Sequence, residues 1–191
     1  MCRIIAFLCV AFLAPAGGAY ASDVPDPDEC TVEPCDAYGG VLTCPHGPGG
    51  AGPDQTAFTV TIRRFGQPLP GVWVEVVLLN ASGHTVCPGA VLTGSTDEHG
   101  QASFNLAIGG CSPDGPAALR ILGNSVVIRH YDRILSPDQD ADGRVGLADF
   151  VLFGAGFGGS GLPCADYNND GLASLADFVT FAACFGRECG E

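Results

Sequence analysis

Residues 138–158 read DQDADGRVGLADFVLFGAGFG, and residues 166–186 read DYNNDGLASLADFVTFAACFG. The two segments align without a gap at an offset of 28 residues, and both contain the run Leu-Ala-Asp-Phe-Val. They also share aspartate at the first and fifth positions, glycine at the sixth, and a final Phe-Gly pair. This many shared positions indicate an internal duplication. We therefore expect two copies of one loop-and-helix unit in the last third of the chain.

Each copy begins with a twelve-residue loop that has oxygen-bearing side chains at alternate positions. The predicted ligands are Asp138, Asp140, Asp142, Asp149 and the carbonyl of Arg144 in the first loop, and Asp166, Asn168, Asp170, Asp177, the carbonyl of Leu172 and, through water, Ser174 in the second. Alternate residues of a curled loop point toward one ion, and glycine at position 6 permits the bend. One such loop could be a solvated acidic turn, but two in register, each followed by an apolar helix, favour two calcium ions. Gly146 at position 9 of the first loop offers no side-chain oxygen, so we expect that site to be weaker or more hydrated.

The details of these loops resemble a known family. Position 12 is aspartate followed by phenylalanine in both copies, and the pairs Ser136-Pro137 and Pro163-Cys164 precede the loops in place of a helix. A duplicated loop-then-helix unit of this kind resembles the dockerin domain over residues 136–191. The resemblance implies a small α domain of two EF-hand-like repeats that attaches a secreted protein to a cohesin-type partner. It places the partner contacts at loop positions 10 and 11, where dockerins often have hydroxyl residues and this chain has Leu147, Ala148, Leu175 and Ala176.

An apolar stripe at helical spacing follows each loop. Its members are Leu147, Phe150, Val151 and Phe157 in the first copy and Leu175, Phe178, Val179 and Phe185 in the second. We expect Phe150 and Phe178 to pack the two helices together, and the remaining apolar residues to leave an exposed patch. Because the Leu-Ala pairs are identical, a partner could bind in either of two orientations related by a half-turn.

Residues 54–132 have the pattern of short, half-buried strands. In TAFTVTIRR (56–64) apolar and polar residues alternate, and VWVEVVLL (72–79), VLTGST (91–96), QASFNLAI (101–108), ALRIL (118–122) and SVVIRH (125–130) are further strand candidates. Strands at this spacing indicate a sandwich. The stretches FGQPLPGVWV (65–74) and TDEHGQASF (96–104) resemble the bacterial Ig-like domains of invasin-type adhesins, and carboxypeptidase-regulatory-like and transthyretin-like sandwiches share both signatures. The predicted fold class is thus an all-β Ig-like sandwich followed by a small α domain.

The turn at residues 97–100 also predicts a disulfide. If Asp97 to Gly100 closes a hairpin between the segments 91–96 and 101–108, then facing residues have numbers that sum to about 197. Cys87 and Cys111 fit this register at the open end of the hairpin, so we expect them to be bonded to each other.

The N-terminus has the order of features found in export signals. Arg3 precedes an apolar run from Ile4 to Leu13, and Ala19-Tyr20-Ala21 is an A-x-A cleavage site. We predict a signal peptide over residues 1–21, a mature chain beginning at Ser22, and a secreted or cell-surface location. The alternative for this segment is a buried N-terminal helix.

Export favours disulfides among the eight cysteines that follow the predicted signal. Five of them precede the duplicated loops and three lie within or after them, so full pairing requires a link between the two parts of the chain, and Cys184 is the candidate for a buried free thiol. Zinc binding by Cys30, Cys35, Cys44 and His46 is an alternative, although paired C-x-x-C spacing is absent. Residues 22–53, rich in Asp, Pro and Gly, are predicted to be a linker or loop-rich lead-in.

Composition and motifs narrow the function. Asp and Glu total 21 against 8 Lys plus Arg, a net charge of −13, which disfavours nucleic-acid binding. The sequence contains no H-E-x-x-H, G-x-S-x-G or phosphate-binding glycine loop, so we expect no catalytic site. Two function classes remain. Either the duplicated loops attach the β domain to a protein partner, or calcium only stabilises an adhesin or stalk fragment.

Overall fold

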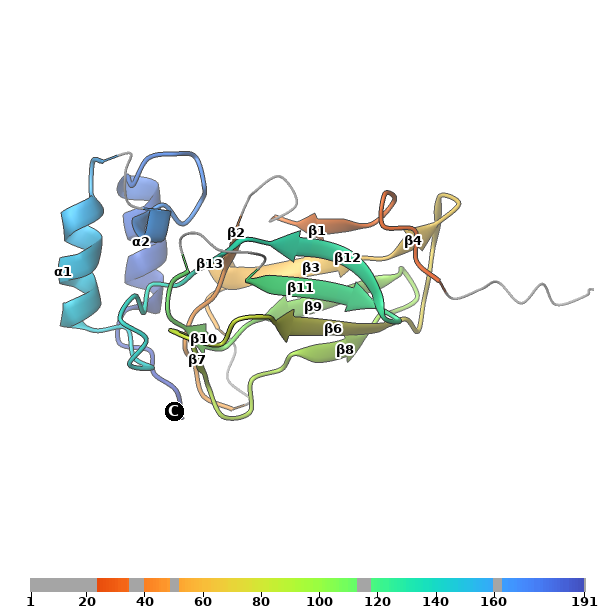
Figure 1. Cartoon of the computed structure of the whole chain (residues 1–191), viewed down its shortest axis with the longest axis horizontal. Helices are drawn as coiled ribbons and strands as arrows, with labels where there is room; N and C mark the ends of the chain where they lie inside the picture. Colours follow the sequence, from red (N-terminus) through yellow and green to blue (C-terminus); the bar gives the residue numbers. More distant parts are fainter. Residues whose placement is uncertain (1–23, 35–39, 49–51, 113–117, 160–162, 191) are drawn as a thin grey trace, which may run out of the picture.

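The structure is a computed structural model of the 191-residue chain, and it describes residues 24–34, 40–48, 52–112, 118–159 and 163–190. Most of the described chain forms a β domain, and two short helices form a smaller helical part at one end of it (Figure 1). The predicted signal peptide and its cleavage site lie outside the described residues. This arrangement confirms a β domain followed by a small helical part.

The first main sheet of the β domain has three antiparallel strands in the order β1-β3-β9, with β1 at Thr31–Glu33, β3 at Ala57–Thr61 and β9 at Gln101–Asn105. The apolar residues of β3 and β9 alternate with polar ones, so each strand has one buried face. Phe58 and Phe104 face each other in the register of β3 and β9, and their rings stack at a centroid distance of 5.7 Å.

The second main sheet has four antiparallel strands in the order β12-β11-β6-β8, formed by Val126–Tyr131, Leu119–Gly123, Trp73–Leu78 and Thr93–Ser95. Buried side chains from both main sheets belong to a single apolar core, which includes Val32, Phe58, Val60, Phe104, Val74, Val76, Leu119 and Ile121. Each of the predicted strand segments contains a strand in the structure.

Two short strand pairs lie where the β domain meets the helical part. β10 (Ile108–Gly109) pairs antiparallel with β7 (Thr85–Val86), and β13 (Arg133–Leu135) pairs parallel with β2 (Gly40–Leu42) (Figure 1). The third short pair, β4 (Arg63–Arg64) and β5 (Gln67–Pro68), closes a turn at the opposite end, and a single 3-10 turn, η2 (Asp54–Thr56), precedes β3.

The lead-in before residue 54 contributes strands to the β domain, where the sequence predicted a linker. β1 pairs with β3 and β2 pairs with β13, and Val32 and Val41 are fully buried. These strands were not predicted because each is only three residues long, too short to show an alternating pattern within a segment rich in Asp, Pro and Gly. A short edge strand needs few apolar residues when the existing sheet supplies its hydrogen-bond partners.

The helical part contains α1 (Leu147–Gly156), the 3-10 turn η3 (Pro163–Ala165) and α2 (Leu175–Cys184). Phe153 and Phe181 are buried and their rings stack at 5.3 Å, whereas Phe150 and Phe178 are partly exposed. The residues that pack the helices together are therefore Phe153 and Phe181, with contacts from Phe150 and Phe178 at the edge. The prediction assigned this role to Phe150 and Phe178 alone.

The core of the helical part is not built from its own residues alone. Cys44 and Leu135, which follow β2 and end β13, belong to the same buried cluster as Phe153, Phe181 and Cys184. Side chains from the β domain thus complete the core under the two helices. Among the described residues, no helix is long and apolar enough to cross a membrane.

The prediction of a disulfide between Cys87 and Cys111 is wrong. Cys87 is bonded to Cys189, and Cys111 is bonded to Cys164. The hairpin on which the prediction depended does not form, because β8 pairs with β6 in one sheet and β9 pairs with β3 in the other. The turn from Asp97 to Gly100 therefore carries the chain between sheets, and it does not place residues 87 and 111 opposite each other.

Both disulfides join the β domain to the helical part. The sequence predicted a link between the two parts only for full pairing of the cysteines, and pairing is not full, because three described cysteines are free. Disulfide bonds are typical of proteins outside the cytosol. Cys30, Cys44 and Cys184 are free and buried, which confirms the prediction for Cys184. Cys30 and Cys44 belong to different apolar clusters, so they do not share a zinc site, and Cys35 lies outside the described residues.

Candidate metal centre

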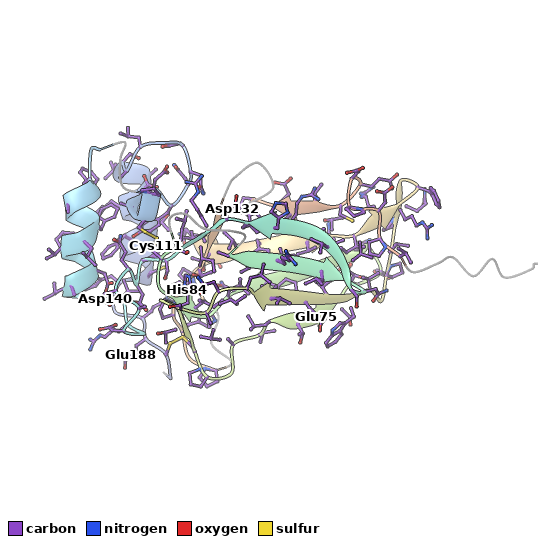
Figure 2. The ribbon with its side chains drawn as sticks, viewed as in Figure 1. Glu75, His84, Cys111, Asp132, Asp140 and Glu188 are labelled. Carbon is purple, nitrogen blue, oxygen red and sulfur yellow. A yellow bond between two sulfur atoms is a disulfide. The ribbon has the colours of Figure 1, made fainter. Side chains whose placement is uncertain are left out.

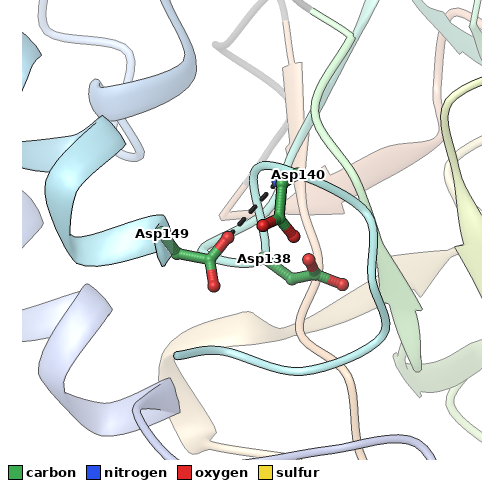
Figure 3. A group of neighbouring side chains, drawn as sticks. All are labelled: Asp138, Asp140 and Asp149. Carbon is green, nitrogen blue, oxygen red and sulfur yellow. Dashed lines mark hydrogen bonds between the residues drawn. The ribbon is translucent and has the colours of Figure 1, made fainter. Parts of the chain in front are cut away.

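The first loop gathers three carboxylates at one point. Single carboxylate oxygens of Asp138, Asp140 and Asp149 all lie within 4.8 Å of one another (Figure 3). Asp138 and Asp149 are buried, and Asp140 is exposed. Asp142 is also exposed, and it accepts a hydrogen bond of 2.8 Å from the amide of Arg144. The structure thus brings together the ligands predicted at positions 1, 3 and 12.

Backbone amides hold these carboxylates in place. Asp149, in the first turn of α1, accepts hydrogen bonds from the amides of Gln139 (2.7 Å) and Gly146 (2.8 Å), so it ties the beginning of the loop to the beginning of the helix. The amide of Gly143 donates to Oδ2 of Asp138 at 3.0 Å. Gly143 has a φ of 88°, a conformation that glycine adopts without strain, which explains why position 6 is glycine.

The second loop repeats this arrangement at equivalent positions. Asp177 accepts from the amides of Tyr167 and Ser174, both at 2.8 Å, and the amide of Gly171 donates to Oδ2 of Asp166 at 2.8 Å. Gly171 has a φ of 92°, close to that of its counterpart. The equivalence of the contacts shows that the duplication extends from sequence to side-chain geometry.

The two loops differ in charge and capping. Asn168 replaces the third-position aspartate, and its side-chain amide donates to Asp170 at 2.9 Å, so the second loop has one fewer carboxylate. Ser174 caps α2 by accepting from the amide of Ala176 at 3.2 Å, and its hydroxyl donates to Asp177 at 3.1 Å. The first loop has Gly146 at that position, which has no side chain to cap α1 or to donate a hydrogen bond to Asp149.

Asp138 is the electrostatic focus of the first loop. Its Oδ1 atom is buried and has no hydrogen-bond partner among the described residues. Burial, together with the negative charges of Asp149, Asp142 and Asp140, raises the pKa of Asp138 to about 7. Burial likewise raises the pKa of Asp149, against the lowering effect of its amide hydrogen bonds. A bound cation would satisfy the free oxygen and remove the repulsion, and clustered carboxylate and carbonyl oxygens are the donors that hard divalent cations prefer.

Each loop makes backbone hydrogen bonds with the segment that follows the helix of the other repeat, and the two sets of bonds are equivalent. Val145 of the first loop exchanges hydrogen bonds with the segment after α2, from its amide to the carbonyl of Arg187 (2.9 Å) and from the amide of Gly186 to its carbonyl (2.8 Å). Ala173 of the second loop exchanges the equivalent bonds with Gly158 and Gly159 after α1. Each loop is therefore hydrogen-bonded to the segment that ends the other repeat.

The exposed face of the helices carries two matching grooves. One, of about 350 Å³, is lined by Leu147, Phe150, Phe178, Phe181, Ala182 and Phe185; the other, of about 420 Å³, is lined by Leu175, Phe178, Phe150, Phe153, Gly154 and Phe157. Each residue of the first groove has its counterpart from the other repeat in the second groove. Leu147 and Leu175 are 75% and 67% exposed, and Ala148 and Ala176 beside them are also exposed.

No family model, no curated protein and no solved structure matches this chain. The sequence pattern singled out the three carboxylates that the structure gathers in the first loop, Asp138, Asp140 and Asp149. It missed the contact between the first loop and β10, which joins residues about 30 positions apart and has no local sequence pattern.

Proposed function

We propose that this chain is a secreted, non-catalytic calcium-binding protein that attaches its β domain to a protein partner, as a dockerin does with a cohesin-type partner. The observation that carries the proposal is the buried, unpartnered Oδ1 of Asp138 beside the carboxylates of Asp140 and Asp149. A buried carboxylate without a partner is costly, and a calcium ion is the ligand that would compensate for it.

Calcium fits the donor set better than other common metals. The donors in both loops are oxygens from aspartate, asparagine and serine side chains, joined in the proposed site by the carbonyls of Arg144 and Leu172. Oxygen-only sets suit calcium or magnesium, whereas zinc and copper favour cysteine sulfur and histidine nitrogen, and neither loop contains cysteine or histidine. Twelve-residue loops with glycine at position 6 have the size and curvature of calcium sites.

The helix face supports the attachment role. Leu147, Val151, Leu175 and Val179 are between 55% and 75% exposed on two adjacent helices, and such a patch is unusual on a surface that faces only water. The exposed Asp142 of the first loop lines a shallow pocket together with Leu147 and Ala148. The proposed partner is therefore a folded protein that presents an apolar centre with a basic rim. Because the two grooves are equivalent, the partner would bind in either of two orientations.

The β domain is proposed to be an Ig-like sandwich that acts as a spacer or binding module. Its two main sheets enclose one core, and its strands alternate between buried and exposed residues. The two disulfides that tie it to the helical part would keep the attachment point at a fixed position relative to the module. Export is supported by these disulfides, which are rare in the cytosol.

Isothermal titration of the full chain with calcium tests the metal part of the proposal, with two ions bound per chain as the expected result. A stoichiometry of zero or one would refute it. Capture of a cohesin-type protein in calcium but not in chelator tests the attachment part. Two bound ions without any calcium-dependent capture would instead support the adhesin or stalk alternative, in which calcium is purely structural.

A further inference from the structure

The first loop is packed directly against the β domain. The amide of Gly110, which follows β10, donates a hydrogen bond of 2.7 Å to the carbonyl of Asp138. The hydroxyl of Thr85 in β7 donates a bond of 2.6 Å to the carbonyl of Ala141 in the loop. The labelled side chains of His84, Cys111 and Asp140 lie at this end of the β domain, next to the helical part (Figure 2).

Gly109 of β10 lies against the side chain of Asp138 itself. A methyl group at position 109 would overlap Oδ2 of Asp138, so only glycine leaves room for the carboxylate. Ser136 extends the contact, because its hydroxyl donates to the carbonyl of Ile108 at 3.3 Å and accepts from the amide of Asp138, also at 3.3 Å. The full burial of Asp138 is thus produced by the β domain rather than by the loop alone.

The second loop is more self-contained. Both carboxylate oxygens of Asp166 accept amide hydrogen bonds from within the loop, from Asp170 at 3.1 Å and from Gly171 at 2.8 Å. The loop approaches the β domain at Asn169, where a methyl group on Gly40 would lie 3.4 Å from Oδ1, and at Tyr167 and Asn168, which line a pocket with Gly40 and Leu42. Asn169 is not among the predicted ligands. The two loops share the amide bond from glycine at position 6 to Oδ2 at position 1. They differ at Oδ1, which accepts the amide of Asp170 in the second loop and has no partner among the described residues in the first, and in what surrounds position 1.

We infer that the first calcium site is shared between the β domain and the helical part: the loop supplies the ligands, and β10 forms the wall that holds Asp138 in position. The inference rests on the proposed calcium function. It assigns Gly109 as a positioning residue for a metal site in a different part of the chain. It also makes calcium at the first loop a clamp between the two parts, whereas calcium at the second loop acts within the helical part.

The clamp follows from linkage. The contact with β10 raises the calcium affinity of the first loop by some factor. By reciprocity, bound calcium must raise the equilibrium constant for forming that contact by the same factor. Hydrogen exchange of the Gly110 amide measures this contact directly, because the amide donates its hydrogen bond to the carbonyl of Asp138. Calcium should therefore slow hydrogen exchange at Gly110, which lies outside both loops.

Calorimetric titration of three variants tests the shared site. Gly109→Ala should bind one calcium ion in the normal range and lose the other, or weaken it by about tenfold or more, the effect of disturbing groups that orient a metal ligand. Asp166→Ala, which removes a ligand of the second loop, should also retain one ion. The double variant should retain neither. Gly94→Ala in β8 is the matched control, since a methyl group there makes only ordinary contact with Phe104, at 3.5 Å, and both ions should still bind.

Two further measurements keep the test decisive if Gly109→Ala does not fold, as judged by circular dichroism. Thr85→Val keeps the side-chain shape but removes the hydrogen bond to Ala141, and it should weaken one site by about two- to tenfold. Hydrogen exchange of the wild-type chain should show protection of Gly110 on addition of calcium. The inference would be overturned if folded Gly109→Ala still bound two ions with unchanged affinity. It would also be overturned if Thr85→Val bound both ions with unchanged affinity and calcium did not change hydrogen exchange at Gly110. A wild-type chain that binds no calcium would instead overturn the proposed function.

Discussion

Cys87, just after β7 of the β domain, is bonded to Cys189 near the C-terminal end of the described chain, 102 residues away in sequence. Cys189 also donates its backbone amide to the carbonyl of Gly143, at position 6 of the first loop, at 2.8 Å. The same residue is therefore held covalently by the β domain and by a hydrogen bond to the candidate metal loop. The disulfide, β10 and the first loop together form one junction.

Disulfide mapping of the unreduced chain should find Cys87 linked to Cys189 and Cys111 linked to Cys164. Replacing both members of either pair by serine should lower the free energy of unfolding by about 2–5 kcal/mol, because each bond closes a long loop in the unfolded chain. Urea denaturation of the two double variants beside the wild type measures the loss. A peptide containing Cys87 linked to Cys111 would contradict the structure.

Calcium should stabilise the chain through both loops. At a calcium concentration one hundred times the dissociation constant, each independent site should add about 2.7 kcal/mol to the free energy of unfolding. Asp138→Asn and Asp166→Asn should each remove one such increment, and the double variant should unfold alike in calcium and in chelator. Denaturation curves with and without calcium give these increments. Equal calcium stabilisation in the double variant and the wild type would exclude both loops as the sites.

Features of this protein that depend on residues close together in the sequence could be predicted, and features that depend on distant residues could not. The carboxylate cluster of the first loop was predictable because the spacing of Asp138, Asp140 and Asp149 is set by one curled segment. The pairing of Cys87 was not, because it depends on β8 and β9 entering different sheets, and that choice is made by the distant strands β6 and β3. The wall formed by Gly109 was missed for the same reason, since the pair Gly109-Gly110 does not indicate which side chain it faces.

The pKa of Asp138 predicts opposite pH dependences with and without calcium. Its value of about 7 in the folded chain lies above the ordinary value of 3.8, so the metal-free folded chain binds this proton more tightly than the unfolded chain does. The resulting stabilisation is fully present below about pH 4 and is lost as the pH rises through 7. Calcium requires the ionised carboxylate, so its affinity for the first loop should instead rise toward pH 7 and then level off.

Denaturation in chelator and calcium titration, each at pH 5, 6, 7 and 8, measure the two trends. Asp138→Asn is the control for the metal-free trend, because it keeps the shape of the side chain but has no proton to lose. The difference in unfolding free energy between the wild type and this variant should change over the interval from pH 5 to pH 8. A difference that stays constant over that interval would show that Asp138 titrates normally.

The two equivalent grooves on the helices predict an unusual mutational pattern for partner binding. Leu147 and Leu175 are the most exposed large apolar residues of the two grooves, and each lies at the start of its helix. Leu147→Asp alone should leave the orientation that depends on Leu175 intact, so affinity should fall only about twofold, the statistical loss of one of two binding modes. Leu175→Asp alone should behave in the same way. The double variant should lose about 2 kcal/mol or more of binding free energy, roughly thirtyfold in affinity, because a charge then occupies the centre of the contact in both orientations.

Val91→Asp, which places the same charge at an exposed valine of the β domain, is the control for partner binding. Titration of each variant with a cohesin-type protein in saturating calcium gives the affinities. A double variant that still binds two calcium ions and binds the partner as tightly as the wild type would show that the partner surface lies elsewhere.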